Sequence, residues 1–241
     1  MPHNLFAQLT EMRQELTRFL LHYQFAVRTM ETKLDILNEE LKTLHDYNPI
    51  EHISSRIKTP ESILKKGMKR NISPSIKAIR EEIRDIAGIR ITCSFVKDIY
   101  ALYEMLQRQA DIKIVEVKDY IKKPKPNGYQ SLHIILQTPI YLAEETDWVY
   151  VEIQIRTVAM DFWASLEHKI YYKYEGEVPK HIKNNLRATA AQIAQIERQM
   201  EELNKEVLHL KMENSTQTKL VSDEQWEKVK QHFIRYLQQL D

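Results

Sequence analysis

The stretch VYVEIQIRT, residues 149–157, carries polar side chains of different chemistry at every second position. Glu152, Gln154 and Arg156 bring together a carboxylate, an amide and a guanidinium, with apolar residues between them. Because neighbouring side chains of a β-strand point to opposite faces, the alternation predicts a strand whose polar face groups the three. A carboxylate beside hydrogen-bond donors suits general-base chemistry, although a solvated strand face would show the same alternation.

A second carboxylate, Asp85, opens the stretch DIAGIRIT, in which Arg90 falls on the polar face of another expected strand. His133 takes the same kind of position in a third expected strand. One sheet would place these side chains over a common cleft, with Asp85 and Glu152 as two carboxylates beside each other. Mg²⁺ bound to substrate phosphates prefers one or two protein carboxylates, so the pair predicts a Mg²⁺ site; Asp85 at a solvated helix end is the alternative.

Phosphates would have to be held by side chains, because the sequence contains neither GxxxxGK[ST] nor GxGxxG. Residues 56–80 supply eight Lys or Arg against one acid, Glu61, which gives a local charge of +7 in a chain of net charge +1. Arginine binds phosphate as a bidentate fork and lysine as a point charge. A solvated basic helix face would have the same composition.

The stretch KPKPNGYQSLH, residues 123–133, places one of only four glycines in the chain next to Tyr129. Proline and glycine predict a fixed turn, Asn127-Gly128-Tyr129, that presents the tyrosine ring beside Lys118, Lys125 and their neighbours. A nucleotide base would stack on the ring while the lysines bind phosphates. A plain hairpin turn with a packed tyrosine fits the stretch equally well.

The elements that must position these residues change period along the chain. The first 45 residues carry apolar residues at alternating spacings of three and four, which predicts one long helix or two. Strands are expected at 89–95, 112–120, 131–136 and 149–156, with a helix at 98–109 between the first two. A loop is expected at SSRIKTPES, followed by a helix from about Glu61 that is capped by Thr59 and Pro60.

Helices are expected again after the last strand, at 157–174, around 193–210 and from 223 to about 240. The periodic apolar residues at 193–210 suit either an oligomer seam or packing against the domain. We therefore expect an N-terminal helical region at 1–47, a catalytic domain at 48–175 and a C-terminal helical region at 176–241. The fold class is α+β, a mixed sheet flanked by helices, with helical extensions at both ends.

Composition limits the classes of protein that remain. Hydrophobic residues make up 43% and charged residues 29%, and no apolar run approaches the roughly 20 residues of a membrane span. The single cysteine, Cys93, cannot form an internal disulfide, and no secretory signal opens the chain, so we expect a cytoplasmic protein. The nine histidines show no zinc-ligand spacing.

Five motifs in order, SRIKTPESILKK, DIAGIRITCSF, KDYIKKPKPNGYQSLH, VEIQIRT and MDFWASLEHK, resemble the synthetase domain of RelA/SpoT-type alarmone enzymes, in the form of the small alarmone synthetases. The resemblance runs from about Asn48 to Lys173. It implies a nucleotidyltransferase-like synthetase fold and a GTP/GDP diphosphokinase of the stringent response. Such an enzyme transfers the β,γ-pyrophosphate of ATP to the ribose 3′-hydroxyl of GDP or GTP, giving ppGpp or pppGpp and AMP.

Site residues follow from the same resemblance, motif by motif. It implies that Asp85 and Glu152 hold Mg²⁺ and that Glu152 activates the 3′-hydroxyl. The ATP-binding residues would be Arg56, Lys58, Ser62, Lys66 and Arg90. The residues that bind GDP or GTP would be Lys118, Lys125, Asn127, Tyr129, His133, Gln154 and Ala164, with Tyr129 stacked on guanine.

The resemblance leaves several alternatives open. Long family members also carry hydrolase and regulatory domains, and 241 residues leave no room for them, so we expect synthesis without hydrolysis. Short members form homotetramers through terminal helices, which suits the two amphipathic ends of this chain. The choice between GDP and GTP stays open. Transfer to the 3′ end of tRNA and a non-catalytic RNA-binding protein are the competing functions.

Overall fold

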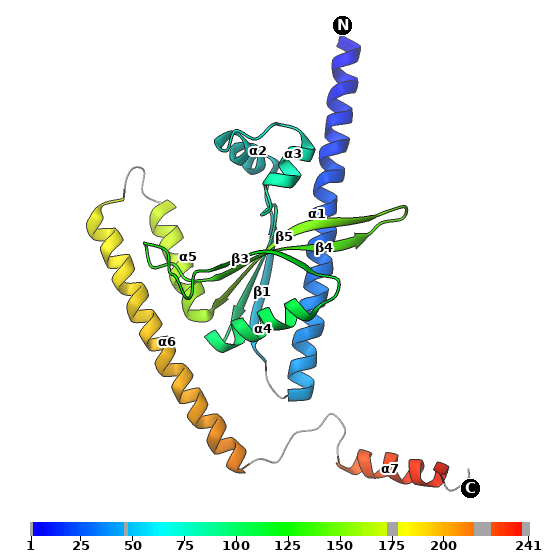
Figure 1. Ribbon diagram of the computed structural model, residues 1–241, viewed down its shortest axis with the longest axis vertical. Helices are drawn as coiled ribbons and strands as arrows, with labels where there is room; N and C mark the ends of the chain where they lie inside the picture. Colours follow the sequence, from blue (N-terminus) through cyan, green and yellow to red (C-terminus); the bar gives the residue numbers. More distant parts are fainter. Residues whose placement is uncertain (1, 46–47, 173–177, 215–222, 238–241) are drawn as a thin grey trace.

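The computed structural model describes residues 2–45, 48–172, 178–214 and 223–237 (Figure 1). The expected domain limits at 47, 175 and 176 lie outside these residues. The elements are α1 (Pro2–His45), β1 (Ile50–Ile57), α2 (Pro60–Lys69), α3 (Ile76–Glu82), β2 (Ala87–Cys93), α4 (Val96–Arg108), β3 (Lys113–Asp119), β4 (Leu132–Tyr141), β5 (Thr146–Thr157), α5 (Val158–Tyr172), α6 (Lys180–Asn214) and α7 (Asp223–Leu237).

One mixed sheet of five strands, in the order β1-β2-β5-β4-β3, forms the centre of the fold. The pair β2–β5 is parallel, and the other three neighbouring pairs are antiparallel. The strand β2, the helix α4 and the strand β3 are consecutive, but β5 and β4 lie between β2 and β3 in the sheet. The predicted α+β class and the mixed sheet are confirmed.

Helices α1 and α4 pack on the apolar face of this sheet (Figure 1). Residues 2–45 form one continuous helix, which decides between the one long helix and the two helices that the sequence allows. Its residues Tyr23, Met30 and Leu34 are buried at the predicted spacing, together with Leu102 from α4 and Ile153 from β5. Because these residues are buried with the strands, the middle of α1 belongs to the core of the sheet. Full burial of each such side chain stabilises the folded state by about 1.5–3 kcal/mol.

The predicted loop at SSRIKTPES is wrong in its first half, because residues 50–57 form the edge strand β1. This strand pairs with β2 and places Ser54 opposite Arg90 and Arg56 opposite Gly88. Two serines and a bulge near its start hide the alternation that sequence reasoning looks for, and an edge strand is held along one side only. The predicted cap of the next helix is confirmed: Thr59 Oγ1 accepts a hydrogen bond from the Ser62 amide, and Pro60 occupies the first turn of α2.

The loop between β3 and β4 packs against α6. The amide of Gly128 donates to the Lys125 carbonyl at 2.8 Å, and Gly128 has a φ of +94°, which side chains disfavour. A Cβ on Gly128 would also lie 2.6 Å from the Cβ of Ala190 on α6. Both the turn and its contact with α6 therefore require glycine at this position.

The helices described here include none that is long and apolar enough to cross a membrane. The predicted C-terminal helices are both present. The helix α6 contains the periodic residues expected at 193–210, and α7 begins at Asp223 as predicted. The expected end of α7, near residue 240, lies outside the described residues.

Gly128→Ala is expected to lower the free energy of unfolding by about 1–3 kcal/mol, because it combines an unfavourable φ with overlap against Ala190. Urea denaturation followed by circular dichroism measures the change. Adding Ala190→Gly should restore the part of the loss that comes from overlap.

Gly67→Ala is the matched control within the same chain. Gly67 lies in α2, and a Cβ there would meet no atom within 4 Å, so alanine should stabilise the helix by about 0.5–1 kcal/mol. If both substitutions changed the unfolding free energy by the same amount, the strain assigned to the loop would be wrong.

Candidate active site

Polar side chains gather on the sheet face opposite the core, in rows that the strand register fixes. Gln154 on β5 lies opposite Arg90 on β2 and opposite His133 on β4, and Glu152 lies opposite Gly88. The expected convergence of these strands on one site is confirmed. What each side chain does there remains a prediction.

Two hollows meet at Glu152. The first, about 200 Å³, is lined by side chains of β1, β2 and β5 that include Arg56, Arg90 and Gln154. The second, about 400 Å³, is lined by charged side chains that include Lys66, Arg70, Asp85, Glu116 and Lys118. Glu152 lines both hollows, so its carboxylate could face two phosphate-bearing ligands, one on each side.

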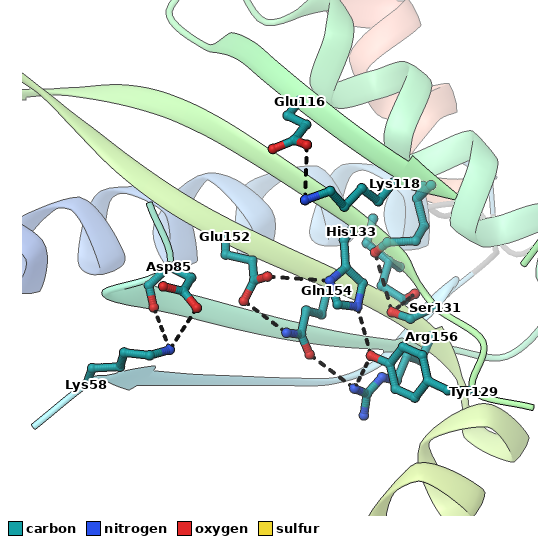
Figure 2. Close-up of polar contacts among 12 residues, drawn as sticks. Lys58, Asp85, Glu116, Lys118, Tyr129, Ser131, His133, Glu152, Gln154 and Arg156 are labelled. Carbon is teal, nitrogen blue, oxygen red and sulfur yellow. Dashed lines mark hydrogen bonds and ion pairs between the residues drawn. The ribbon is translucent and has the colours of Figure 1, made fainter. Parts of the chain in front are cut away.

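Gln154 and His133 each contact one oxygen of the Glu152 carboxylate (Figure 2). Gln154 Nε2 donates to Oε2 at 2.9 Å, and His133 Nδ1 lies 3.4 Å from Oε1. Burial raises the pKa of Glu152, but the hydrogen bond and charge of His133, with the hydrogen bond from Gln154, outweigh it and hold the pKa below its usual value. The carboxylate is therefore ionised and oriented at neutral pH, as a proton acceptor must be.

Asp85 is the second carboxylate of the site, and it forms ion pairs with Lys58 and Lys66. Lys58 Nζ lies 3.0 Å from both Asp85 Oδ2 and the Asp85 carbonyl oxygen. Burial raises the pKa of Asp85, but the hydrogen bonds from Lys66 and Lys58 overcome it and lower the pKa. Asp85 Oδ1 is buried and accepts no hydrogen bond from any residue that the structure describes.

This free carboxylate oxygen suits a divalent cation. Asp85 and Glu152 line one hollow and carry the oxygen ligands that Mg²⁺ prefers. The described residues hold no cluster of three or more side chains that could chelate a metal alone. The two carboxylates thus fit a Mg²⁺ ion that takes its remaining ligands from substrate phosphates and water.

The hydroxyl of Tyr129 contacts two site residues, His133 and Arg156 (Figure 2). Tyr129 Oη lies 2.8 Å from His133 Nε2 and accepts a hydrogen bond from Arg156 Nη2 at 2.6 Å. Cations lie against its ring: Lys125 Nζ is 4.7 Å and the Arg156 guanidinium 5.0 Å from the ring centre. The ring also packs on a cluster of Trp163, Ala164, Leu186 and Ala190 from α5 and α6.

The other residues that the sequence predicts for the site lie in different places: beside Tyr129, in the second hollow, or outside both hollows. Ala164 is buried beside Tyr129, and Lys118 pairs with Glu116 at 3.0 Å in the second hollow. Asn127 is turned toward α5, where its Nδ2 donates to Glu167 Oε1 at 3.0 Å. Ser62 is engaged in the cap of α2 and lines neither hollow.

Sequence reasoning left several site residues without a role. Arg156 was placed on the polar face but not assigned, and Arg70 was one of several cations in the basic segment. Asp161 on α5 pairs with both Arg156 and Arg90, at 3.0 and 3.6 Å. No sequence signal identifies Asp161, because its contacts depend on how α5 turns back from β5.

A model of the region found in RelA/SpoT proteins matches residues 55–177. The GTP pyrophosphokinase YwaC of Bacillus subtilis is 48% identical over 188 residues, which are 78% of this chain and 90% of that protein. The solved structure of small alarmone synthetase 2 from B. subtilis matches with a TM-score of 0.73 at 45% identity, over 80% of this chain and 99% of that one.

Small alarmone synthetase 1 from the same organism, solved with its product pppGpp, matches with a TM-score of 0.75 at 36% identity. The match covers 81% of this chain and 99% of the other. The resemblance read from the five motifs is thereby confirmed in both sequence and fold. The chain belongs to the RelA/SpoT family, among its small alarmone synthetases.

Proposed function

We propose that this protein transfers the β,γ-pyrophosphate of ATP to the ribose 3′-hydroxyl of GDP or GTP and releases AMP. The observation that carries the proposal is the ionised Glu152, which lies between a hollow that contains Arg side chains and a second hollow that contains both Lys or Arg and carboxylate side chains. Two nucleotides bound on either side would bring a hydroxyl and a phosphate chain to one carboxylate. The relatives named GTP pyrophosphokinase, and the one solved with pppGpp, support the same reaction.

The reaction joins the acceptor 3′-oxygen to the β-phosphorus of ATP and breaks the bond from that phosphorus to the oxygen of the α-phosphate. AMP leaves with that oxygen, and the proton of the hydroxyl passes to Glu152. Transfer of this kind needs alignment and neutralisation of charge more than covalent help from the protein. The cations of the two hollows supply the neutralisation.

ATP is assigned to Arg56, Lys58, Ser62, Lys66 and Arg90. Arg56 and Arg90 lie in the first hollow, whereas Lys66 lies in the second, where it pairs with Asp85. An extended phosphate chain that runs from one hollow to the other past Glu152 would contact both groups. Asp85 keeps Lys58 and Lys66 paired before ATP arrives, so these charges need not be reordered when phosphates bind.

GDP or GTP is assigned to Lys118, Lys125, Asn127, Tyr129, His133, Gln154 and Ala164. Stacking of guanine on Tyr129 requires one cation to leave the ring. Lys125 is exposed, and Arg156 is buried and held by three hydrogen bonds, so Lys125 is the residue that moves. Once displaced, Lys125 remains close enough to bind the phosphates of the same nucleotide.

Mg²⁺ is proposed as the cofactor, held by Asp85 and Glu152. When bound, it would neutralise charge on the phosphate oxygens during transfer. The enzyme is proposed to work in the cytoplasm, where ATP and guanine nucleotides are available and where the buried Cys93 stays reduced.

Incubating the purified protein with Mg²⁺, GDP or GTP, and ATP labelled in its γ-phosphate tests the reaction directly. Chromatography is expected to show label in ppGpp or pppGpp and AMP in equal amount, and the two parallel reactions rank GDP against GTP. Failure to label either nucleotide would reject the proposal. A parallel tube with tRNA then tests the alternative acceptor.

Glu152→Gln is expected to lower kcat by a factor of roughly 10²–10⁴, because a positioned carboxylate base contributes about that much. Binding of ATP and GDP, measured by calorimetry, should remain detectable. Glu116→Gln is the matched control, since it removes a carboxylate that lines the same hollow and should change kcat by less than about tenfold. Equal losses in the two variants would show that charge in the hollow, rather than the base, accounts for the effect.

A homotetramer is proposed from the apolar surface that one chain leaves uncovered. On α6, large apolar residues stand at spacings of four and three and are half exposed: Ile196, Met200, Leu203, Val207 and Leu210. Such a row suits a seam with another helix. Light scattering is expected to give about four times the 28.7 kDa of one chain, and Met200→Glu with Leu203→Glu should lower that mass. A monomeric wild-type protein would contradict the proposal.

A further inference from the structure

Five side chains of the site form a closed ring of polar contacts (Figure 2). Arg156 Nη2 donates to Tyr129 Oη at 2.6 Å and to Gln154 Oε1 at 3.1 Å. From Tyr129 the ring continues to His133 Nε2 at 2.8 Å, and His133 Nδ1 lies 3.4 Å from Glu152 Oε1. From Gln154 it continues through Nε2 to Glu152 Oε2 at 2.9 Å. Two arms thus start at one nitrogen of Arg156 and end on the two oxygens of Glu152.

The chemistry of the two ends fixes the direction of the contacts that Arg156 and Glu152 make. A guanidinium can only donate hydrogen bonds, and an ionised carboxylate can only accept them. Gln154 must therefore turn its oxygen to Arg156 and its amide hydrogens to Glu152. His133 must carry hydrogen on Nδ1, the ring nitrogen that faces the Glu152 carboxylate.

Arg156 is buried, with 5% of its surface exposed, and it lines neither hollow. Its charge is met by Asp161 on α5, whose Oδ1 accepts from Nη1 at 3.0 Å. A buried charge is costly unless it is paired, and removing one partner is more costly still. The position of Arg156 behind Tyr129 and Gln154 means that it acts on substrates through these residues.

We infer that Arg156 is a positioning residue that couples the acceptor platform, Tyr129, to the base, Glu152. The inference rests on the proposed function, in which Tyr129 binds the acceptor base and Glu152 takes the proton. When the nucleotide base stacks on Tyr129, movement of the Tyr129 hydroxyl is passed to Glu152 by way of His133. Gln154 keeps the second oxygen in place meanwhile. The Glu152 carboxylate is thereby aligned when the acceptor nucleotide is bound.

A double-mutant cycle tests the coupling. Tyr129→Phe keeps the stacking ring and removes the hydroxyl, and Arg156→Met removes both arms at their origin. Charge-assisted hydrogen bonds are worth about 1.5–3 kcal/mol, so each single variant should lower kcat roughly tenfold to a hundredfold. ATP binding should change less than about threefold. In the Arg156→Met background, Tyr129→Phe should cost at most about twofold, and full additivity would overturn the inference.

Arg156→Lys serves the same cycle if Arg156→Met does not fold. It keeps a positive charge beside Asp161 and replaces the planar fork by a single shorter donor. Thermal unfolding followed by circular dichroism shows which variants are folded. A fall in kcat with an unchanged melting temperature separates positioning from a loss of structure.

An NMR measurement decides the inference without reference to catalysis. In ¹⁵N-labelled protein, the imidazole signals of His133, assigned with His133→Gln, should show hydrogen on Nδ1. Tyr129→Phe and Arg156→Lys should shift these signals, whereas Arg90→Gln, which also removes a partner of Asp161, should not. Unshifted signals in both ring variants would overturn the inference. Absence of transfer by the wild-type enzyme would instead reject the proposed function, with the NMR result still deciding the ring.

Discussion

The parallel pairing of β2 with β5 is the constraint on which the rest of the site depends. Its register sets Gly88 beside Glu152 and Arg90 beside Gln154, so a slip of one residue along the strands would separate the Glu152 carboxylate from the cations. Side chains on the other face of the same strands, including Ile89 and Ile153, are fully buried under α1 and α4. The core therefore specifies the register, and the register specifies the site.

Electrostatic balance explains how the site can hold so many charges without substrate. The second hollow combines cations with carboxylates, and Asp85 is paired with Lys58 and Lys66 rather than left alone. Ion pairing keeps the pKa of Asp85 low despite burial. Under the proposed function, phosphate oxygens that enter this hollow would replace one anionic partner of the lysines by another, which would limit the reorganisation that binding requires. A chain without a glycine-rich phosphate loop can bind nucleotides in this way because side chains perform the task of the backbone amides.

Much of this arrangement was readable from the sequence, and the reasons differ from part to part. The period of two predicts the polar face of β5, because one face of that strand is buried and residues 149–156 are long enough to show four apolar–polar pairs. The strand β1 was missed because Ser54 and Ser55 interrupt the alternation and the pairing is one-sided. Roles taken from the family resemblance placed Tyr129 and Glu152 in the site but not the contacts between them. The contacts that link them, and others such as Arg156 with Asp161, join residues whose distance depends on tertiary packing rather than on their spacing in the sequence.

The helix α6 links the loop between β3 and β4, which carries Tyr129, to the surface proposed for assembly. Its first half supports Tyr129 through Leu186 and Ala190, and Ala190 also limits the loop at Gly128. Its second half exposes the apolar row that begins at Ile196. A continuous helix is stiff over this length, so a partner that tilts or shifts the exposed half also moves the half that contacts Tyr129. The ring of polar contacts that contains Arg156 and Glu152 also contains that same tyrosine, and a movement of α6 therefore has a defined physical route to Glu152.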